Sequence, residues 1–191
     1  MPATPLAPMP ASAALAPPMP APREAFAAVY RANVGTVWSW LRRMGVRREE
    51  REDLTQQTFA IACQRFEAFD PTRPARPWLL GIAFRVAVAA RRTLEAKAEF
   101  VDEAHGTADE ALGPEARLQQ RQARELLWKG LSTLSVEQRA IFTLVELEGL
   151  SMPEAAEVLE VPLNTGYSRL RLARAALTAA LQTMTSKEAV R

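Results

Sequence analysis

Apolar residues recur at spacings of three and four through two stretches of the chain, residues 23–97 and 115–184. This is the periodicity of amphipathic helices, and no alternating strand pattern interrupts it. In the first stretch, the apolar residues between Phe26 and Met44 form one broad stripe on a helix that Gly45 should end. The pattern predicts an all-α protein of two small helical domains, with three helices in the first domain.

The other two helices of the first domain follow the same periodicity. The second is predicted from about Glu49 to Phe66, with Thr55 and Phe59 on its core edge. Another edge of this helix is a polar row: Asp53, Gln56, Gln57, Ala60 and Gln64. Three prolines then predict an extended loop, and Pro77 suits the first turn of a third helix. The expected core side of that helix is Trp78, Leu79, Ile82, Val86, Ala90 and Leu94.

The second domain carries the signals of a helix-turn-helix. Ser135 to Gln138 and Ser151 to Glu154 are capping boxes, and Glu160 to Pro162 predicts a tight turn before a last helix over 163–184. The apolar back of that helix is Leu163, Gly166, Leu170, Ala173 and Leu177. Its hydrogen-bonding front is Thr165, Tyr167, Ser168, Arg169, Arg171 and Arg174. A helix that enters the major groove needs this division, although an ordinary helical bundle can also show it.

Two segments outside the domains should lack fixed structure. Residues 1–22 are uncharged and hold eight prolines, which predicts a disordered Ala/Pro tail. Residues 98–114 are small and acidic, which predicts a flexible linker. The tail has neither the basic start nor the continuous apolar run of a signal peptide, so we expect a cytoplasmic protein without membrane insertion.

Charge is distributed unevenly along the chain. Residues 23–98 carry 14 basic and 8 acidic residues, residues 99–115 carry six acids and no base, and residues 116–191 carry 10 bases and 8 acids. Basic domains suggest a polyanionic partner, although a solvated arginine-rich surface would look the same. On the third helix, Arg85, Arg91 and Arg92 accompany Trp78, a combination that suits phosphate and unstacked bases.

Metal, cofactor and catalytic sites are not expected. The single cysteine, Cys63, excludes an intrachain disulfide and a cysteine-clustered zinc site, and the single histidine, His105, excludes a histidine-rich metal site. We interpret Cys63 as a small residue of the core. An enzyme is therefore the least favoured class of protein.

Taken together, the residues resemble those of a known family. The first set of motifs is Asp53-Leu54-Thr55-Gln56-Gln57-Thr58-Phe59, Arg65-Phe66, Phe69-Asp70-Pro71, Trp78-Leu79-Leu80-Gly81-Ile82-Ala83 and Arg91-Arg92. The second set is Leu131 to Leu134, Arg139, Phe142, Leu144, Glu148-Gly149-Leu150-Ser151, Glu154-Ala155-Ala156, Ser168-Arg169-Leu170 and Ala173-Arg174. In order and spacing they resemble the two domains of RNA polymerase sigma factors of the extracytoplasmic-function (ECF) group.

The resemblance implies a sigma factor that binds core RNA polymerase and promoter DNA. By the resemblance, Asp53, Gln56 and Gln57 would contact the clamp helices of the β′ subunit. The proline loop and third helix would hold the melted −10 element, and the helix-turn-helix would bind the −35 element. An anti-sigma protein is a further partner that the resemblance suggests.

Five positions depart from what is usual in that family. Gln57 stands where an acid is common, and Arg85 and Ala89 stand near the usual Asn and Asp of the third helix. Glu160 replaces a turn glycine, which predicts a left-handed or bridge conformation at a cost of ~1 kcal/mol or more. Gly166 lies inside the last helix, where glycine costs about 1 kcal/mol.

Two other functions fit parts of the pattern. In a one-component helix-turn-helix regulator, residues 24–97 would be an effector or dimerisation domain, but a polar helix row does not make the apolar cavity that an effector needs. A helical interaction protein without a DNA role would not account for the arginines on the front of the last helix. We therefore favour the sigma factor.

Overall fold

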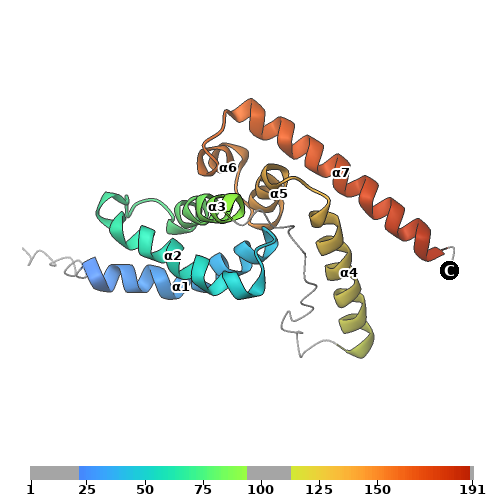
Figure 1. Cartoon of the computed structure of the whole chain (residues 1–191), viewed down its shortest axis with the longest axis horizontal. Helices are drawn as coiled ribbons and strands as arrows, with labels where there is room; N and C mark the ends of the chain where they lie inside the picture. Colours follow the sequence, from blue (N-terminus) through green and yellow to red (C-terminus); the bar gives the residue numbers. More distant parts are fainter. Residues whose placement is uncertain (1–21, 94–112, 190–191) are drawn as a thin grey trace, which may run out of the picture.

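The computed structural model describes residues 22–93 and 113–189, and these residues are almost entirely helical. The predicted tail and linker lie almost wholly outside the described residues, as does Leu94. Within the described parts the chain forms seven α-helices, α1 to α7, and two short helical turns (Figure 1). The prediction of an all-α protein with two small helical domains is confirmed.

The first domain is a bundle of α1 (Pro22–Arg43), α2 (Arg48–Gln64) and α3 (Ala75–Thr93), with a 3₁₀ turn at Phe66–Ala68. All three helices contact one another. Gly45 follows α1 with φ of 81°, as a helix-ending glycine should. The core of the bundle is built from Val37, Trp40, Leu41, Leu54, Phe59, Leu79, Ile82 and Val86.

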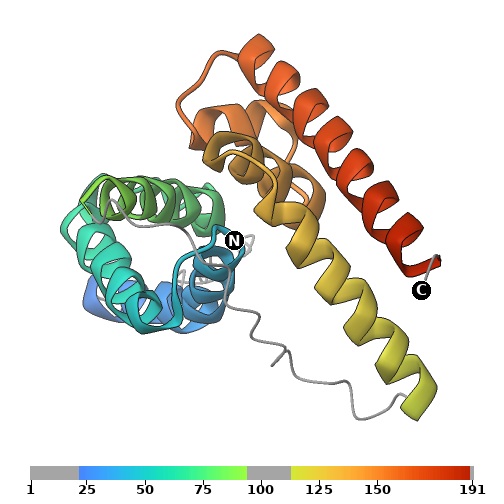
Figure 2. The ribbon, with the colours of Figure 1, turned by 45° about the vertical axis from the view of Figure 1, so that its right-hand side comes forward.

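The second domain contains α4 (Pro114–Ser132), α5 (Val136–Phe142), α6 (Met152–Val158) and α7 (Leu163–Ala189). The helix α5 continues into a π-helical turn at Thr143–Leu147. Both predicted capping boxes form, at the N-termini of α5 and α6. Figure 2 shows the long helices α4 and α7 extending together away from the first domain.

Glycine at position 166 is explained by the packing of α6 against α7. A Cβ atom at Gly166 would lie 3.0 Å from the Met152 sulfur and 3.7 Å from the Ala156 Cβ. The glycine therefore lets the two helices of the helix-turn-helix approach closely, which offsets its poor helix propensity. The turn before α7 contains Glu160 with φ of 54°, which confirms the predicted left-handed conformation.

The two domains pack against each other through α3 and α6 (Figure 1). Gly81 faces α6 so closely that a Cβ there would lie 3.2 Å from the Val158 carbonyl oxygen. Burial on α3 extends beyond the predicted stripe, since Leu80, Ala83 and Ala87 are also buried. A one-sided amphipathic pattern could not predict this, because α3 packs against α1, α2 and α6.

Two predictions about individual side chains are wrong. Cys63, expected in the core, is exposed, because it follows the buried Ala62 by one residue and so points off the core edge of α2. Leu163, expected on the apolar back of the last helix, is 43% exposed. It is the first residue of α7, where no neighbouring helix turn covers it. The other four residues of that apolar back are buried.

Candidate nucleic-acid interface

The polar row of α2 lies on the surface of the first domain. Asp53, Gln56 and Gln57 are exposed, whereas Thr55 and Thr58 on the opposite edge are buried. The two threonine hydroxyls each donate a hydrogen bond of 2.7 Å to a backbone carbonyl one turn earlier, so the core edge has its own polar groups satisfied. The exposed row is thus free to contact a partner.

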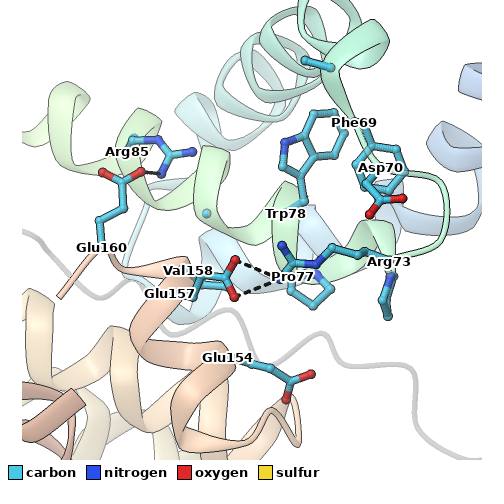
Figure 3. Close-up of a pocket in the computed structure, with 13 residues that line it drawn as sticks. Phe69, Asp70, Arg73, Pro77, Trp78, Arg85, Glu154, Glu157, Val158 and Glu160 are labelled. Atoms are coloured by element: carbon cyan, nitrogen blue, oxygen red, sulfur yellow. Dashed lines mark hydrogen bonds and ion pairs between the residues drawn. The ribbon is translucent and has the colours of Figure 1, made fainter. Parts of the chain in front are cut away.

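An aromatic cluster lies at the start of α3. Phe69 and Trp78 have ring centroids 4.7 Å apart, and Phe66 stacks on Phe69 at 5.8 Å. Phe69 and Trp78 line a cleft of about 470 Å³ (Figure 3). The opposite wall of the cleft is formed by Glu154, Glu157, Val158 and Glu160 of the second domain. The sequence singled out Trp78 and missed Phe69, although Phe69 occupies a motif position.

The loop between α2 and α3 is held by an aspartate turn. The Oδ1 atom of Asp70 accepts hydrogen bonds from the Thr72 amide at 2.9 Å and the Thr72 hydroxyl at 2.7 Å. These bonds lower the pKa of Asp70. Because an aspartate turn replaces chain flexibility with fixed geometry, it positions the next residue, Arg73, toward the second domain.

Arginines of this region pair with acids of the helix-turn-helix domain. Arg73 Nη2 contacts both carboxylate oxygens of Glu157, at 2.8 and 2.9 Å, and Arg85 Nη1 lies 2.6 Å from Glu160 (Figure 3). Arg76 forms an ion pair with Glu148. The sequence predicted Arg85 as a DNA contact but missed Arg73 and Arg76, whose only signal was their place in the proline loop.

Glu148 joins two arginines of the first domain. Its side chain is only 2% exposed, and its two carboxylate oxygens accept from Arg43 and Arg76. Burial lowers the pKa of Arg43. Glu148 directly follows the π-helical turn, and its amide donates a hydrogen bond to the Thr143 carbonyl at 2.9 Å. The wider turn thereby sets the direction in which Glu148 leaves the helix.

A buried arginine also connects the domains. Arg139 donates to the carbonyls of Leu131 at 2.8 Å and Leu134 at 3.2 Å in its own domain, and to that of Met44 at 3.1 Å in the first domain. Burial lowers the pKa of Arg139 to about 10, with a smaller contribution from Arg91. Arg91 is exposed, and the side chain of Arg92 lies outside the described residues.

The front of α7 is largely open to solvent. Tyr167 is 55% exposed, and Ser168, Arg171 and Arg174 are exposed as well, whereas Thr165 and Arg169 are half-buried. Arg174 Nε lies 2.9 Å from Glu146 Oε1, an ion pair that the sequence did not predict. The N-terminal turns of α7 therefore present an aromatic ring, a hydroxyl and a guanidinium group on one side, as a helix that enters the major groove requires.

Residues 22–93 and 113–189 contain neither a metal-binding cluster nor a membrane-spanning helix. No group of three or more histidine, cysteine, aspartate or glutamate side chains there could hold a metal ion. None of the helices described is both long enough and apolar enough to cross a membrane.

The first domain carries the exposed polar row of α2 and, around the start of α3, an aromatic–arginine region made of Phe69, Trp78, Arg73, Arg76 and Arg85. Joined to a helix-turn-helix domain, these surfaces define a DNA-binding transcription factor. Residues 29–96 match the family model "Sigma-70 region 2", and residues 124–177 match "Sigma-70, region 4". The chain belongs to the sigma-70 family and, within it, to the ECF group. It is a sigma factor that directs RNA polymerase to promoters.

The relatives agree with this assignment. The chain is 32% identical to RNA polymerase sigma factor NccH of Alcaligenes xylosoxydans over 74% of its own length and 78% of that protein. It is 30% identical to CnrH of Cupriavidus metallidurans over 76% of its length and 81% of that protein.

Two solved structures are similar in fold. That of CnrH with the cytosolic domain of CnrY gives a TM-score of 0.59 at 26% identity and covers 84% of this chain and 90% of CnrH. The sigma factor RpoE with the anti-sigma factor NepR, from Bartonella quintana, gives a TM-score of 0.65 at 19% identity, over 83% of this chain and 98% of that one.

Proposed function

We propose that this chain recognises promoters through three surfaces, each with its own binding partner. Asp53, Gln56 and Gln57 bind core polymerase, the aromatic–arginine region around α3 binds the melted −10 strand, and the front of α7 binds the −35 duplex. The observation that carries the proposal is that each surface lies within a matched sigma region and that the predicted contacts are exposed on α2 and, for Tyr167, Ser168, Arg171 and Arg174, on α7. The division places polymerase and −10 binding in residues 23–97 and −35 binding in residues 115–184.

Transcription in vitro tests the proposed function as a whole. Core polymerase is supplied with a library of genomic promoters, with and without this chain. Transcripts that start at defined positions only when the chain is present support it. If the chain gives no such transcripts yet binds DNA upstream of genes without polymerase, the one-component regulator is favoured instead.

Three broader proposals accompany this one. The protein acts in the cytoplasm, where the polymerase is found, and it has no catalytic activity of its own. An anti-sigma protein holds it inactive, as the partners of CnrH and RpoE in the solved complexes suggest. Co-purification of the chain from its host identifies such a partner by mass spectrometry.

Replacing Asp53 and Gln56 with alanine should weaken binding to core polymerase. Both side chains are exposed, and exposed substitutions usually change the free energy of unfolding by less than ~0.5 kcal/mol, so the fold should persist. Affinity for core is measured by titration with labelled protein, and melting is measured in parallel. The control is Glu24→Ala, which removes an exposed acid from α1. If both folded variants and the native chain bind core polymerase with equal affinity, this surface does not bind the polymerase.

Replacing Arg85 with alanine should reduce the salt dependence of single-strand binding. An arginine that contacts one phosphate contributes a slope of about 0.7 in log K against log salt for single strands. The measurement is fluorescence anisotropy with a labelled oligonucleotide across a salt series, and Arg31→Ala, an exposed arginine of α1, is the control. An unchanged slope for Arg85→Ala would rule out a direct phosphate contact.

A further inference from the structure

Charges are segregated by sign across the contact between the two domains. The first domain contributes arginines to the ion pairs there, and the second contributes glutamates. The pairs are Arg43–Glu148, Arg76–Glu148, Arg73–Glu157 and Arg85–Glu160. Three of these arginines belong to the loop and helix that form the proposed −10 surface.

Two residues that depart from the usual family pattern meet in this contact. Arg85 stands near a usual neutral amide and Glu160 stands at a usual glycine, and their side chains lie 2.6 Å apart. Glu160 is held at φ of 54°, a conformation that disfavours any residue with a Cβ. A strained residue needs a compensating interaction, and the ion pair to Arg85 supplies one.

The contact covers one of the three proposed surfaces and leaves the other two open. Glu157, Val158 and Glu160 form the wall of the cleft opposite Phe69 and Trp78, so they occupy the side from which a strand would reach these aromatic rings. The polar row of α2 and the front of α7 remain exposed. A glutamate carboxylate, like a phosphate, is an anion that accepts hydrogen bonds from a guanidinium group.

Binding both promoter elements requires this contact to open. Elements centred at −10 and −35 are separated by about 25 base pairs, or roughly 85 Å of duplex at ~3.4 Å per base pair. In the closed arrangement, Arg85 of the −10 surface lies 2.6 Å from Glu160, which belongs to the turn before α7. Domains in direct contact cannot reach both elements at once.

We propose that the glutamates of the helix-turn-helix domain occupy the −10 surface in cis and must be displaced by the DNA strand. The inference rests on the proposed function of the arginines around α3. Glu148, Glu157 and Glu160 occupy the positions on these arginines that strand phosphates would take, and we call these ion pairs between the domains the latch. Within the latch, the pair of Glu160 with Arg85 is particular to this chain. Opening exchanges carboxylates for phosphates on the same guanidinium groups.

The test neutralises the two exposed acids of the latch in the full chain, as Glu157→Gln with Glu160→Gln. Glutamine keeps the shape of the side chain and removes its charge. Binding of a labelled 12-nucleotide single strand of mixed sequence should tighten about fivefold at low salt, because each exposed ion pair contributes modestly. Small-angle scattering should show a larger radius of gyration. Both differences should shrink at high salt, where screening weakens the latch of the native chain.

Two further variants separate the latch from a general change of charge. Glu137→Gln removes an exposed acid of α5 whose carboxylate accepts a hydrogen bond from Ser135 of its own domain, and it should leave both measurements unchanged. Glu160→Arg should expand the chain, and adding Arg85→Glu should make it compact again, because the pair is restored with its charges exchanged. Compactness is the readout here, since Arg85 is itself a proposed strand contact.

The outcomes distinguish the latch from the function on which it rests. Unchanged compactness and unchanged strand affinity in the double glutamine variant would overturn the latch. Expansion without tighter strand binding would overturn the claim that the glutamates mask the arginines. If the variants expand but neither they nor the native chain bind a single strand at any salt concentration, the contact is real and the proposed −10 surface fails.

Discussion

Replacing Arg139 with alanine should lower the free energy of unfolding by about 3 kcal/mol. The guanidinium group is buried and donates to the carbonyls of Leu131, Leu134 and Met44. Alanine would remove the guanidinium donor from the Leu134 and Met44 carbonyls, whereas the Leu131 carbonyl would keep the Leu134 amide at 3.2 Å. Each buried polar group left unsatisfied costs about 1–3 kcal/mol. Lysine should rescue only part of the loss, because one ammonium group cannot reproduce the fork of donors.

Urea denaturation of the full chain, followed by circular dichroism, measures this loss. The control is Arg121→Ala, which removes an exposed arginine paired with Glu125 on α4 and should cost less than ~0.5 kcal/mol. A loss of less than about 1 kcal/mol for Arg139→Ala would mean that water replaces the guanidinium donors. Because one bond reaches Met44, the variant should also loosen the contact between the domains.

Replacing Arg171 with alanine should lower the preference for the favoured base at one position of the −35 element by about ten- to a hundredfold. Arg171 is exposed and shares a face of α7 with Tyr167 one turn earlier, where both can reach base edges. A bidentate contact between arginine and guanine contributes ~1–3 kcal/mol of discrimination. Sequences selected from a randomised duplex pool by the native and variant chains measure the change.

Arg174→Ala is the matched comparison on the same helix. Arg174 lies a turn further along α7 and pairs with Glu146. When DNA binds, Arg174 should exchange that carboxylate for a phosphate, which adds affinity for DNA of any sequence but no base preference. The variant should weaken all sequences about equally and lower the salt slope by about 0.9. If both variants select the native element with native affinity, α7 does not bind DNA.

Local pattern was enough to predict most elements of this fold. Helix periodicity predicted the three helices of the first domain, and the serines at 135 and 151 predicted where α5 and α6 begin. These features depend on residues within one or two turns of each other. The left-handed backbone at Glu160 was predicted from the family resemblance instead, because a glycine is usual at that position.

The exposed candidate residues were predictable for the same reason. Asp53, Gln56 and Gln57 share an edge of α2 by spacing alone, and Tyr167 and Arg171 share a face of α7. Burial was predicted wrongly for two side chains: Cys63 lies at the border of an apolar stripe, and Leu163 lies at a helix end. There the pattern does not say whether a neighbouring element will cover the side chain.

The sequence by itself determined the helices, their caps, the two domains and the family. Only the tertiary structure decided that the domains meet at α3 and α6, that a π-helical turn directs Glu148 toward Arg43 and Arg76, and that Arg85 faces Glu160. These pairs join residues 72 to 105 positions apart, whereas helix periodicity relates only residues a few positions apart. Which arginine meets which glutamate depends on how two separately folded surfaces fit, and a pattern along one chain does not contain that information.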